Sequence, residues 1–429
     1  MQHLTRPARS FVVVALAALA LSAVLAGIST AQSPDGTPAH PYTDLEEGKN
    51  AARTAGKPLL VLFRTPECAF TKLFYEQTVP DTAVQEALAG LVFTSIDVEK
   101  GKGKFIGQMH EVKATPTFVL YDPDRGPLHQ WKGWAPVAFI QNLSGGLRSN
   151  TPVVERLNRY ETTPTAEDAA LLGFFWASSG NFGGAYDAFQ KAVELNSSFD
   201  FRAESFDAAA SGYGTGQIPI AKLERAATDV LAQNDSDEEH VNVASILVAV
   251  TEGTPDAERA APFLATALEK AKSSSAPNIQ QAAVRLEPYR LLYLAHDPAA
   301  AVDAYQRRYP GWPNDPDALN NVAWWCRTHQ IELDRAEDWA RKSVDGYTEP
   351  GDRANARDTL ADILLLRGKK KEAIDQLFLA FKDAPRELKY GLKLKELGAE
   401  VELPEAPSRT VNVVPSGDGT ETEQESTKP

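Results

Sequence analysis

Residues 58–71 read Pro-Leu-Leu-Val-Leu-Phe-Arg-Thr-Pro-Glu-Cys-Ala-Phe-Thr, and this stretch decides the fold of the first part of the chain. Its first six residues are continuously apolar, which is typical of a strand buried on both faces. A short turn leads to Cys68, and a helix follows that is recognisable from Lys72 onward. The stretch therefore predicts a strand, a turn and a helix, with a thiol on the first turn of that helix.

The segments around this unit alternate between predicted strands and helices. The residues Asp-Pro-Asp-Arg-Gly over 122–126 indicate a hairpin turn between the last two strands. The other predicted elements are helices over 42–55, 105–110 and 136–147, and strands over 91–98, 118–121 and 128–131. This order predicts an α/β sandwich of about one hundred residues with a mixed central sheet.

The order of elements and several sequence signals resemble the thioredoxin family over residues 42–148. Thr115-Pro116-Thr117 enters a strand at the place where that family keeps a cis proline facing its active cysteine. Phe63 lies five residues before Cys68, as the family has it. The resemblance implies a thioredoxin-like α/β sandwich, which we assign to residues 42–150.

The family motif W-C-x-x-C corresponds here to Glu-Cys-Ala-Phe-Thr at residues 67–71. In the family, the first thiolate attacks a substrate disulfide and the second cysteine resolves the mixed disulfide. The resemblance therefore makes Cys68 the attacking group and places Thr71 at the resolving position. It also implies that Thr115 and Pro116 present backbone to a substrate strand.

Several features of the sequence act on the pKa of the Cys68 thiol. The helix N-terminus and Lys72, one turn further on, favour the thiolate. The Thr71 hydroxyl can donate a hydrogen bond to that thiolate, whereas Glu67 acts in the opposite direction. The combination makes a lowered pKa for Cys68 reasonable.

Two departures from the family leave two functions open. The acid that the family usually buries beneath the motif corresponds to Leu62, and the lysine facing it corresponds to Phe93, so the usual proton-relay pair is absent. The enzyme hypothesis is a monothiol thiol-disulfide exchange, in which an external thiol resolves Cys68. The alternative is a protein-binding adaptor whose thioredoxin fold has no redox activity.

A thiol peroxidase is a third, less favoured hypothesis. Thr65-Pro66-Glu67-Cys68 is similar to the T-x-x-C of peroxiredoxins, in which a thiolate attacks a peroxide. That family also needs a proline where this chain has Val61, and an arginine near the strand entry where this chain has Thr115-Pro116.

From about residue 153 to 400 the pattern becomes helical only, and one period is written twice. Counted from Gly173, a small, a large and a small residue follow at offsets 12, 16 and 19, and the same offsets recur counted from Ala361. This pattern resembles the tetratricopeptide repeat (TPR), a helical hairpin in which small residues let two helices approach closely. Clear units span 166–199, 318–344 and 354–387.

Residues 200–316 match the repeat only in fragments. Helices are predicted over 220–233, 240–251, 257–272 and 279–294, and residues 300–305, followed by Pro310, resemble the second helix of a repeat. We interpret them as degenerate repeats, so the fold class is a thioredoxin-like α/β sandwich followed by an all-α solenoid of TPR type. Solenoids provide extended concave grooves, which predicts a protein or peptide partner on that face.

The two ends of the sequence carry different signals. Two arginines precede an apolar stretch over 11–27, and small residues follow at 29 and 31, which is the pattern of a secretory signal peptide. We therefore expect a signal peptide over 1–31, a linker over 32–41 and export to the periplasm or the extracellular space. No membrane span is expected after cleavage, although an uncleaved anchor is the alternative. A disordered tail is predicted over 402–429.

Charge and cysteine usage exclude several classes of protein. Lys plus Arg total 44 against 58 Asp plus Glu, a net charge of -14, which argues against a nucleic-acid partner. Two cysteines exclude a disulfide-stapled scaffold, and neither histidine spacing nor a nucleotide motif predicts a metal or a cofactor. Cys326, beside Trp324 and Trp325 in a repeat helix, is predicted to be a core residue. No pattern indicates an oligomeric state.

Overall fold

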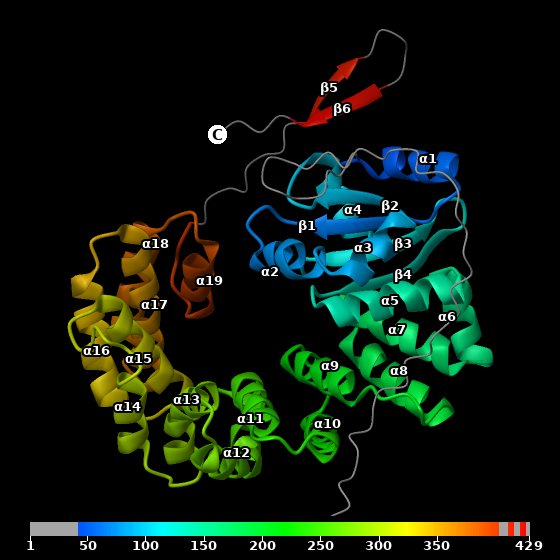
Figure 1. The fold of residues 1–429 in the computed structure, drawn as a ribbon. Helices are drawn as coiled ribbons and strands as arrows, with labels where there is room; N and C mark the ends of the chain where they lie inside the picture. Colours follow the sequence, from blue (N-terminus) through cyan, green and yellow to red (C-terminus); the bar gives the residue numbers. More distant parts are fainter. Residues whose placement is uncertain (1–41, 403–410, 416–420, 426–429) are drawn as a thin grey trace, which may run out of the picture.

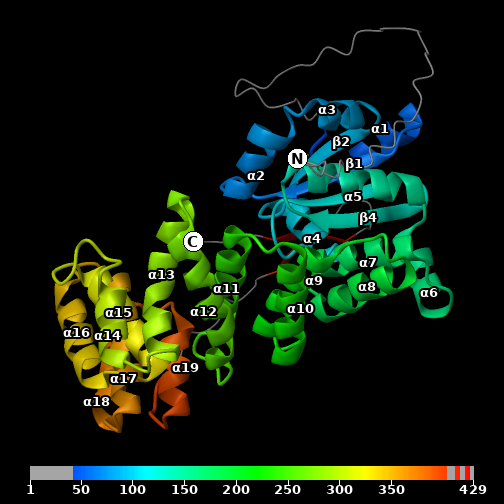
Figure 2. The ribbon, with the colours of Figure 1, turned by 60° about the horizontal axis from the view of Figure 1, so that its bottom comes forward.

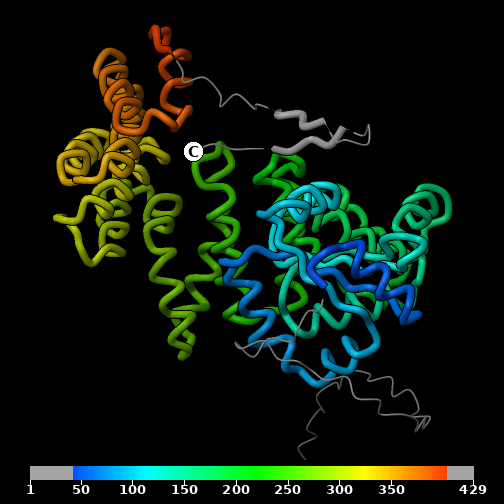
Figure 3. The backbone as a smooth tube through the Cα atoms, turned by 90° about the horizontal axis from the view of Figure 1, so that it is seen from above, coloured from blue at the N-terminus to red at the C-terminus, as the bar shows by residue number. Residues whose placement is uncertain are grey.

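The computed structural model describes residues 42–402, 411–415 and 421–425. The predicted signal peptide and linker lie outside these residues. An α/β domain, drawn in blue to cyan in Figure 1, is followed by helices that curve away beneath it and rise on the other side. Figure 2 and Figure 3 follow the same path from two further directions.

The first domain is built on a four-stranded mixed sheet in the order β2-β1-β3-β4. Strand β1 (Leu59–Arg64) pairs in parallel with β2 (Val92–Asp97) and antiparallel with β3 (Thr117–Asp122), which pairs antiparallel with β4 (Gly126–Lys132). The helical elements are α1 (Leu45–Ala55), α2 (Ala69–Leu73), the π-helical turn η1 (Phe74–Thr78), α3 (Thr82–Ala89), α4 (Gly101–Met109) and α5 (Pro136–Ser149). The prediction of an α/β sandwich with a mixed sheet is confirmed.

The apolar run in β1 is buried on both faces of the sheet. Leu60 and Leu62 lie in one core with side chains of η1, α3 and α5. Leu59, Val61 and Phe63 lie in a second core with side chains of α1 and α4. Successive side chains of a strand point to opposite faces, so a central strand between two helical layers has no polar positions.

The described residues from 153 to 396 form a helical solenoid. After α6 (Val153–Thr162), consecutive helices contact one another as a series of hairpins, and one apolar core runs from Ala185 to Leu394. The hairpins are α7 (Ala166–Ser179) with α8 (Phe182–Leu195), α9 (Arg202–Gly214) with α10 (Ile220–Gln233), α11 (Asp237–Thr251) with α12 (Ala261–Ser273, after the 3-10 turn η2, Ala257–Ala260), α13 (Pro277–Tyr293) with α14 (Pro298–Gln306), α15 (Pro316–His329) with α16 (Leu333–Gly346), and α17 (Pro350–Leu366) with α18 (Lys370–Asp383). Helix α19 (Leu388–Glu396) packs on the last hairpin.

The spacing that indicated the repeat has a direct structural reason. A Cβ atom added to Gly173 on α7 would lie 2.5 Å from the ring of Phe189 on α8. Only glycine lets the two helices approach this closely around the large side chain. The three repeat units predicted over 166–199, 318–344 and 354–387 correspond to the hairpins α7–α8, α15–α16 and α17–α18.

The degenerate middle region is helical as predicted, with one helix that the sequence pattern did not reveal. Helix α10 has the predicted bounds, but α9 was not predicted. Its buried residues are mostly small, namely Ser205, Phe206, Ala208, Ala209, Ala210 and Gly212. Because small residues contrast little with polar ones, the apolar periodicity of α9 is weak.

The α/β domain and the solenoid share a buried interface. Strand β4 lies at the edge of the sheet and contacts α6 and α7. Arg156 of α6 is fully buried and donates hydrogen bonds to the carbonyl oxygens of Leu128 on β4 (2.8 Å) and Thr151 (3.0 Å). Its Nε lies 3.4 Å from the buried carboxylate of Asp168 on α7. The sheet edge is thus covered by the first helices of the solenoid.

The C-terminal segment predicted to be disordered contains regular structure. Strands β5 (Val411–Pro415) and β6 (Glu421–Glu425) pair antiparallel as a separate two-stranded sheet. The prediction of disorder rested on the polar composition of the whole tail. It gave too little weight to the β-branched residues Val411, Val413 and Val414, which favour a strand. Among the described helices, none has the length and apolar character needed to cross a membrane.

Candidate functional site at Cys68

The local chain path brings Cys68 to the start of a helix directly after the buried strand β1. Cys68 has extended backbone angles and is the N-cap residue of α2. Its amide donates a hydrogen bond to the Thr65 carbonyl (3.3 Å), and its own carbonyl accepts one from the amide of Lys72 (3.1 Å). The thiol therefore lies where the free N–H groups of the first helical turn converge.

A distant loop completes the surroundings of the thiol. The Cys68 Sγ donates a hydrogen bond to the carbonyl oxygen of Thr115 (3.1 Å), and the Thr115 hydroxyl lies 3.5 Å from that of Thr65. The Thr115-Pro116 peptide bond is cis, as the family resemblance implies. The structure thus brings together Cys68, Thr71, Thr115 and Pro116.

The surroundings lower the pKa of the Cys68 thiol from its ordinary value. Burial alone raises this pKa, but the side chains of Thr115 and Thr71 and the backbone N–H groups of Thr71 and Phe70 favour the thiolate and together outweigh burial. The bond from the neutral thiol to the Thr115 carbonyl is lost on ionisation. The site therefore favours a nucleophilic thiolate.

Thr71 occupies the position of the second cysteine in the family motif. Its side chain is buried, with 5% exposed, and its hydroxyl has no hydrogen-bond partner among the described residues. The Thr71 side chain nevertheless acts on Cys68 in the direction that lowers the thiol pKa. Because this buried hydroxyl has no other acceptor, we expect it to donate a hydrogen bond to the Cys68 thiolate once the thiolate forms.

The two charged residues expected to modulate the site face solvent. The Lys72 ammonium lies 3.8 Å from the Glu67 carboxylate, and the two side chains are 60% and 93% exposed. Their opposite charges offset each other and are screened by water. The main contributions to the lowered pKa of Cys68 come instead from Thr115, Thr71 and the helix backbone.

The position beneath the motif is apolar. Leu62 is fully buried in the core of the sheet, and Phe93 packs partly buried against the same core. Among the described residues of this domain, no carboxylate is buried. The domain therefore lacks the internal acid that relays protons in its relatives, as the sequence indicated.

The second cysteine takes no part in the site. Cys326 on α15 is fully buried in the solenoid core, and burial raises the pKa of its thiol to about 12. Both cysteines are free. The prediction that Cys326 is a core residue is confirmed.

The turn between α7 and α8 lies against the loop that carries Pro116, which sequence reasoning missed. A Cβ atom on Gly180 of this turn would lie 3.4 Å from the side chain of Lys113, three residues before Pro116. The ammonium of Lys132 lies 5.2 Å from the ring centroid of Phe182, at the start of α8. These are contacts between segments far apart in sequence, and no local pattern reveals them.

The described residues contain no cluster of three or more histidine, cysteine or acidic side chains able to hold a metal ion. The chemistry that the arrangement supports is that of a single activated thiol.

Residues 40–123 match a family model described as thioredoxin-like. This part of the chain is a thioredoxin-like domain. The match covers the sheet strands β1, β2 and β3, Cys68 and the cis Pro116. TPR-like helices follow the thioredoxin-like domain.

Solved structures similar to this chain include members of both kinds. A thioredoxin from Thermus thermophilus has 23% sequence identity and a TM-score of 0.23, covering 24% of this chain and 83% of its own. YrrB, a TPR protein with an unusual peptide-binding site, has 16% identity and a TM-score of 0.22, covering 56% and 96%. The TPR2AB domain of yeast Sti1 in complex with pHSP90 has 15% identity and a TM-score of 0.21, covering 54% and 96%. No curated protein matches the sequence.

Proposed function

We propose that this protein catalyses monothiol thiol-disulfide exchange on proteins that its helical solenoid holds. The observation that carries the proposal is the single partly exposed thiol of Cys68, with a lowered pKa, 3.1 Å from the Thr115 carbonyl. Thr115 is half-buried, and once Cys68 ionises its carbonyl no longer accepts from the thiol and can accept a hydrogen bond from the backbone of an extended substrate segment next to its disulfide. Thr115 and Pro116 would then position the substrate, and Cys68 would react with it.

The reaction conserves electrons without a cofactor. The Cys68 thiolate attacks one sulfur of a substrate disulfide; the substrate S–S bond breaks, a mixed disulfide forms, and the second substrate sulfur leaves as a thiolate that takes up a proton from water. A second thiol, from the substrate protein or from a small thiol compound, loses its proton to water, and its thiolate attacks the substrate sulfur of the mixed disulfide; a new disulfide forms, the bond to Cys68 breaks, and the Cys68 thiolate is released. When the resolving thiol also belongs to the substrate protein, one substrate disulfide is exchanged for another, and the substrate is neither oxidised nor reduced.

The identity of residue 71 decides between monothiol and dithiol chemistry. The Thr71 hydroxyl stabilises the thiolate but forms no bond to sulfur, so the mixed disulfide has no internal route of resolution. We therefore expect mixed disulfides to persist long enough to be isolated, and we expect poor reduction of insulin.

We further propose that the protein works outside the cytoplasm. The signal-peptide pattern of residues 1–31 supports export, and substrate disulfides persist in the periplasm and the extracellular space. Fractionation of cells that express the full chain, with detection of the protein in each fraction, tests this point. Recovery of the uncleaved chain in the cytoplasm would contradict it.

A redox-silent adaptor is the second candidate function. The apolar Leu62 beneath the motif and the threonine in place of the resolving cysteine favour this alternative. In an adaptor, the thioredoxin-like domain would serve as a binding module, and Cys68 would have no turnover.

Trapping of mixed disulfides separates the two candidates. Wild type, Cys68→Ser and the matched control Cys326→Ser are incubated with extracts of the compartment to which the protein is exported, and adducts are compared on gels with and without reductant. Exchange predicts reductant-sensitive adducts with wild type and Cys326→Ser, and none with Cys68→Ser. The same bands for all three proteins, or none for any, would leave only the adaptor.

A gain-of-function variant gives an independent test of the site. Thr71→Cys places a second thiol on the same helical turn as Cys68 and is expected to raise insulin reduction well above the wild-type rate. An equally inactive Thr71→Cys protein would show that the surroundings of Cys68 do not admit substrate disulfides.

A further inference from the structure

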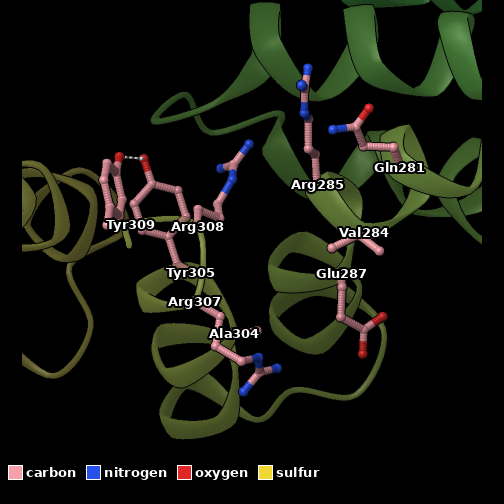
Figure 4. Close-up of a pocket in the computed structure, with 9 residues that line it drawn as sticks. All are labelled: Gln281, Val284, Arg285, Glu287, Ala304, Tyr305, Arg307, Arg308 and Tyr309. Carbon is pink, nitrogen blue, oxygen red and sulfur yellow. Dashed lines mark hydrogen bonds between the residues drawn. The ribbon is translucent and has the colours of Figure 1, made fainter. Parts of the chain in front are cut away.

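A cavity of about 530 Å³ lies in the hairpin of α13 and α14 on the solenoid (Figure 4). Helix α13 contributes Val284 and Arg285 to its wall, and the end of α14 and the residues after it contribute Tyr305, Arg307, Arg308 and Tyr309. This volume falls within the range of ordinary ligand sites, roughly 300–1,000 Å³.

The arginines that line the cavity differ from their neighbours because they form no salt bridge with a described residue. Between residues 277 and 383 the arginines that form salt bridges are Arg290, Arg327, Arg335, Arg341, Arg353, Arg357 and Arg367. The remaining arginines of this segment are Arg285, Arg307 and Arg308, and no salt bridge joins them to any described residue. All three line the cavity.

The nearest carboxylate is already engaged. Glu287 also lines the cavity, but both of its carboxylate oxygens accept hydrogen bonds from Arg290, at 2.8 and 2.7 Å. Arg307 lowers the pKa of Glu287 only after the larger effect of Arg290. The arginines of the cavity thus retain capacity for an external anion.

Arg308 is held in place by an aromatic stack. Its guanidinium carbon lies 4.9 Å from the ring centroid of Tyr305, and the Tyr305 ring stacks on Trp325 with centroids 4.5 Å apart. Tyr309 donates a hydrogen bond to the Tyr305 hydroxyl (3.3 Å), drawn as a dashed line in Figure 4. A guanidinium fixed in this way loses little conformational freedom when it binds a carboxylate.

The geometry points to an acidic segment of a partner protein as the occupant. In Figure 4, Arg285 of α13 and Arg308, which follows the end of α14, extend to the same side of the cavity, while Arg307 and Glu287 point to the other side. Guanidinium groups bind carboxylates through paired hydrogen bonds. Val284, which is 69% exposed, and the ring of Tyr309 provide an apolar wall for a neighbouring aliphatic side chain.

We propose that this cavity, the α13–α14 arginine site, binds an acidic peptide segment with an aliphatic residue among its carboxylates. In a chain with a net charge of -14, Arg285 and Arg308, which extend to the same side of the cavity and form no salt bridge to a described residue, favour an anionic partner. This binding does not depend on the reactivity of Cys68, so Cys68→Ser retains it.

The test uses the whole protein and a fluorescein-labelled peptide with the sequence Glu-Glu-Leu-Glu-Glu, followed by fluorescence anisotropy. Binding is expected to weaken with added NaCl, and the peptide Gln-Gln-Leu-Gln-Gln is expected to bind at least about tenfold more weakly, since it lacks the charge-assisted hydrogen bonds. The double variant Arg285→Ala/Arg308→Ala is expected to show a similar loss. Arg386→Ala, an exposed arginine outside the cavity, serves as the matched control and should keep wild-type affinity.

Several outcomes would overturn the proposal. Wild-type affinity in the double variant, with its helical circular dichroism unchanged, would show that the arginines do not bind the peptide. Full displacement of the peptide by an equal concentration of inorganic phosphate would indicate a small-anion site, and tighter binding to phosphatidylglycerol vesicles than to the peptide would indicate a lipid surface. Tighter peptide binding by Glu421→Gln/Glu423→Gln/Glu425→Gln would mean that the chain's own tail occupies the site, and a dimer that Arg285→Glu dissociates would mean that a second copy does.

Discussion

The sulfur of Cys68 lies 3.1 Å from the carbonyl oxygen of Thr115, although 47 residues separate the two in sequence. The first residue opens a helix and the second precedes the cis Pro116, so the contact joins the two segments on which thioredoxin-like chemistry depends. The carbonyl accepts from the neutral thiol only. Ionisation of Cys68 therefore frees this carbonyl to accept another hydrogen bond, which in the proposed reaction comes from a substrate backbone.

The first prediction concerns the hydroxyl of Thr71. Thr71→Val keeps the shape of the side chain but removes the group that helps to lower the pKa of Cys68. We expect this pKa to rise, the rate of alkylation by iodoacetamide at neutral pH to fall severalfold, and the pH profile of alkylation to move to higher pH. Measurement in the Cys326→Ser background ensures that only Cys68 is followed.

Thr71→Ser is the control for this substitution, because it keeps the hydroxyl and should keep the wild-type profile. If Thr71→Val and Thr71→Ser displace the profile equally, packing at residue 71 rather than its hydroxyl sets the reactivity of the thiol.

The second prediction concerns the packing of the first repeat. Gly173→Ala places a methyl group 2.5 Å from the Phe189 ring, so one of the two helices must shift. We expect the free energy of unfolding to fall by about 1–3 kcal/mol, the usual cost of overpacking a core, measured by urea denaturation. Gly351→Ala on α17 is the matched control: its Cβ would meet nothing within 4 Å, so stability should be unchanged or slightly higher.

A smaller side chain in place of Phe189 should restore part of the stability that Gly173→Ala loses. Gly173→Ala/Phe189→Leu is expected to be more stable than the sum of the two single effects, because the smaller side chain leaves room for the methyl group. Strict additivity of the two substitutions would mean that the contact does not limit the approach of α7 to α8.

The sequence predicted those parts of the fold that are written locally. The unbroken apolar run at 58–63 indicated a strand between two helical layers, and the offsets counted from Gly173 indicated a helical hairpin. Helix α9 escaped prediction because its buried face is mostly small residues, and the β5–β6 pair because its strands lie in a polar tail. A periodicity argument works only where buried and exposed residues differ clearly in character.

The residues of the candidate site could be predicted from the sequence, but their side-chain contacts and the resulting effects on the pKa of Cys68 could not. The sequence identified Cys68, Thr71, Thr115 and Pro116, whereas the exposed pairing of Glu67 with Lys72 depends on side-chain conformation. The contact between the α7–α8 turn and the Pro116 loop, and the three unpaired arginines of α13–α14, follow from the tertiary arrangement. No spacing rule brings such distant residues together.

The third prediction concerns the buried arginine between the two domains. Arg156→Ala removes three hydrogen bonds, to Leu128, Ser149 and Thr151, and leaves the Asp168 carboxylate buried with Arg159 as its remaining cation. We expect the free energy of unfolding to fall by about 3–5 kcal/mol, the typical cost of breaking a buried ion pair.

An exposed ion pair at the same junction provides the control for Arg156→Ala. Arg148→Ala breaks a contact of 4.0 Å with Glu167 in which both side chains are largely exposed, and should cost less than about 1 kcal/mol. Equal losses for the two variants, measured by urea denaturation at neutral pH, would show that the interface does not depend on the buried guanidinium.

The last prediction concerns the pH dependence of stability and rests on His129. This histidine of β4 is fully buried at the junction; its Nε2 lies 2.9 Å from Asn142 Oδ1, and its Nδ1 has no hydrogen-bond partner among the described residues. Asn142 uses its own amide to donate to the Ala138 carbonyl, so its Oδ1 accepts from a neutral His129 protonated at Nε2. A second proton, on Nδ1, would have no acceptor.

Burial accordingly lowers the pKa of His129 to about 3, whereas the unfolded chain has the ordinary value of about 6.5. Between these values the unfolded state binds one more proton than the folded state. The contribution of His129 to stability is therefore complete above about pH 6.5 and is lost as the pH falls toward 3, by about 1.4 kcal/mol per pH unit. Urea denaturation of wild type and His129→Gln at pH 7.0, 5.5 and 4.5 measures this slope. The variant should lose stability less steeply than wild type over that range, and parallel curves would show that another group controls acid unfolding.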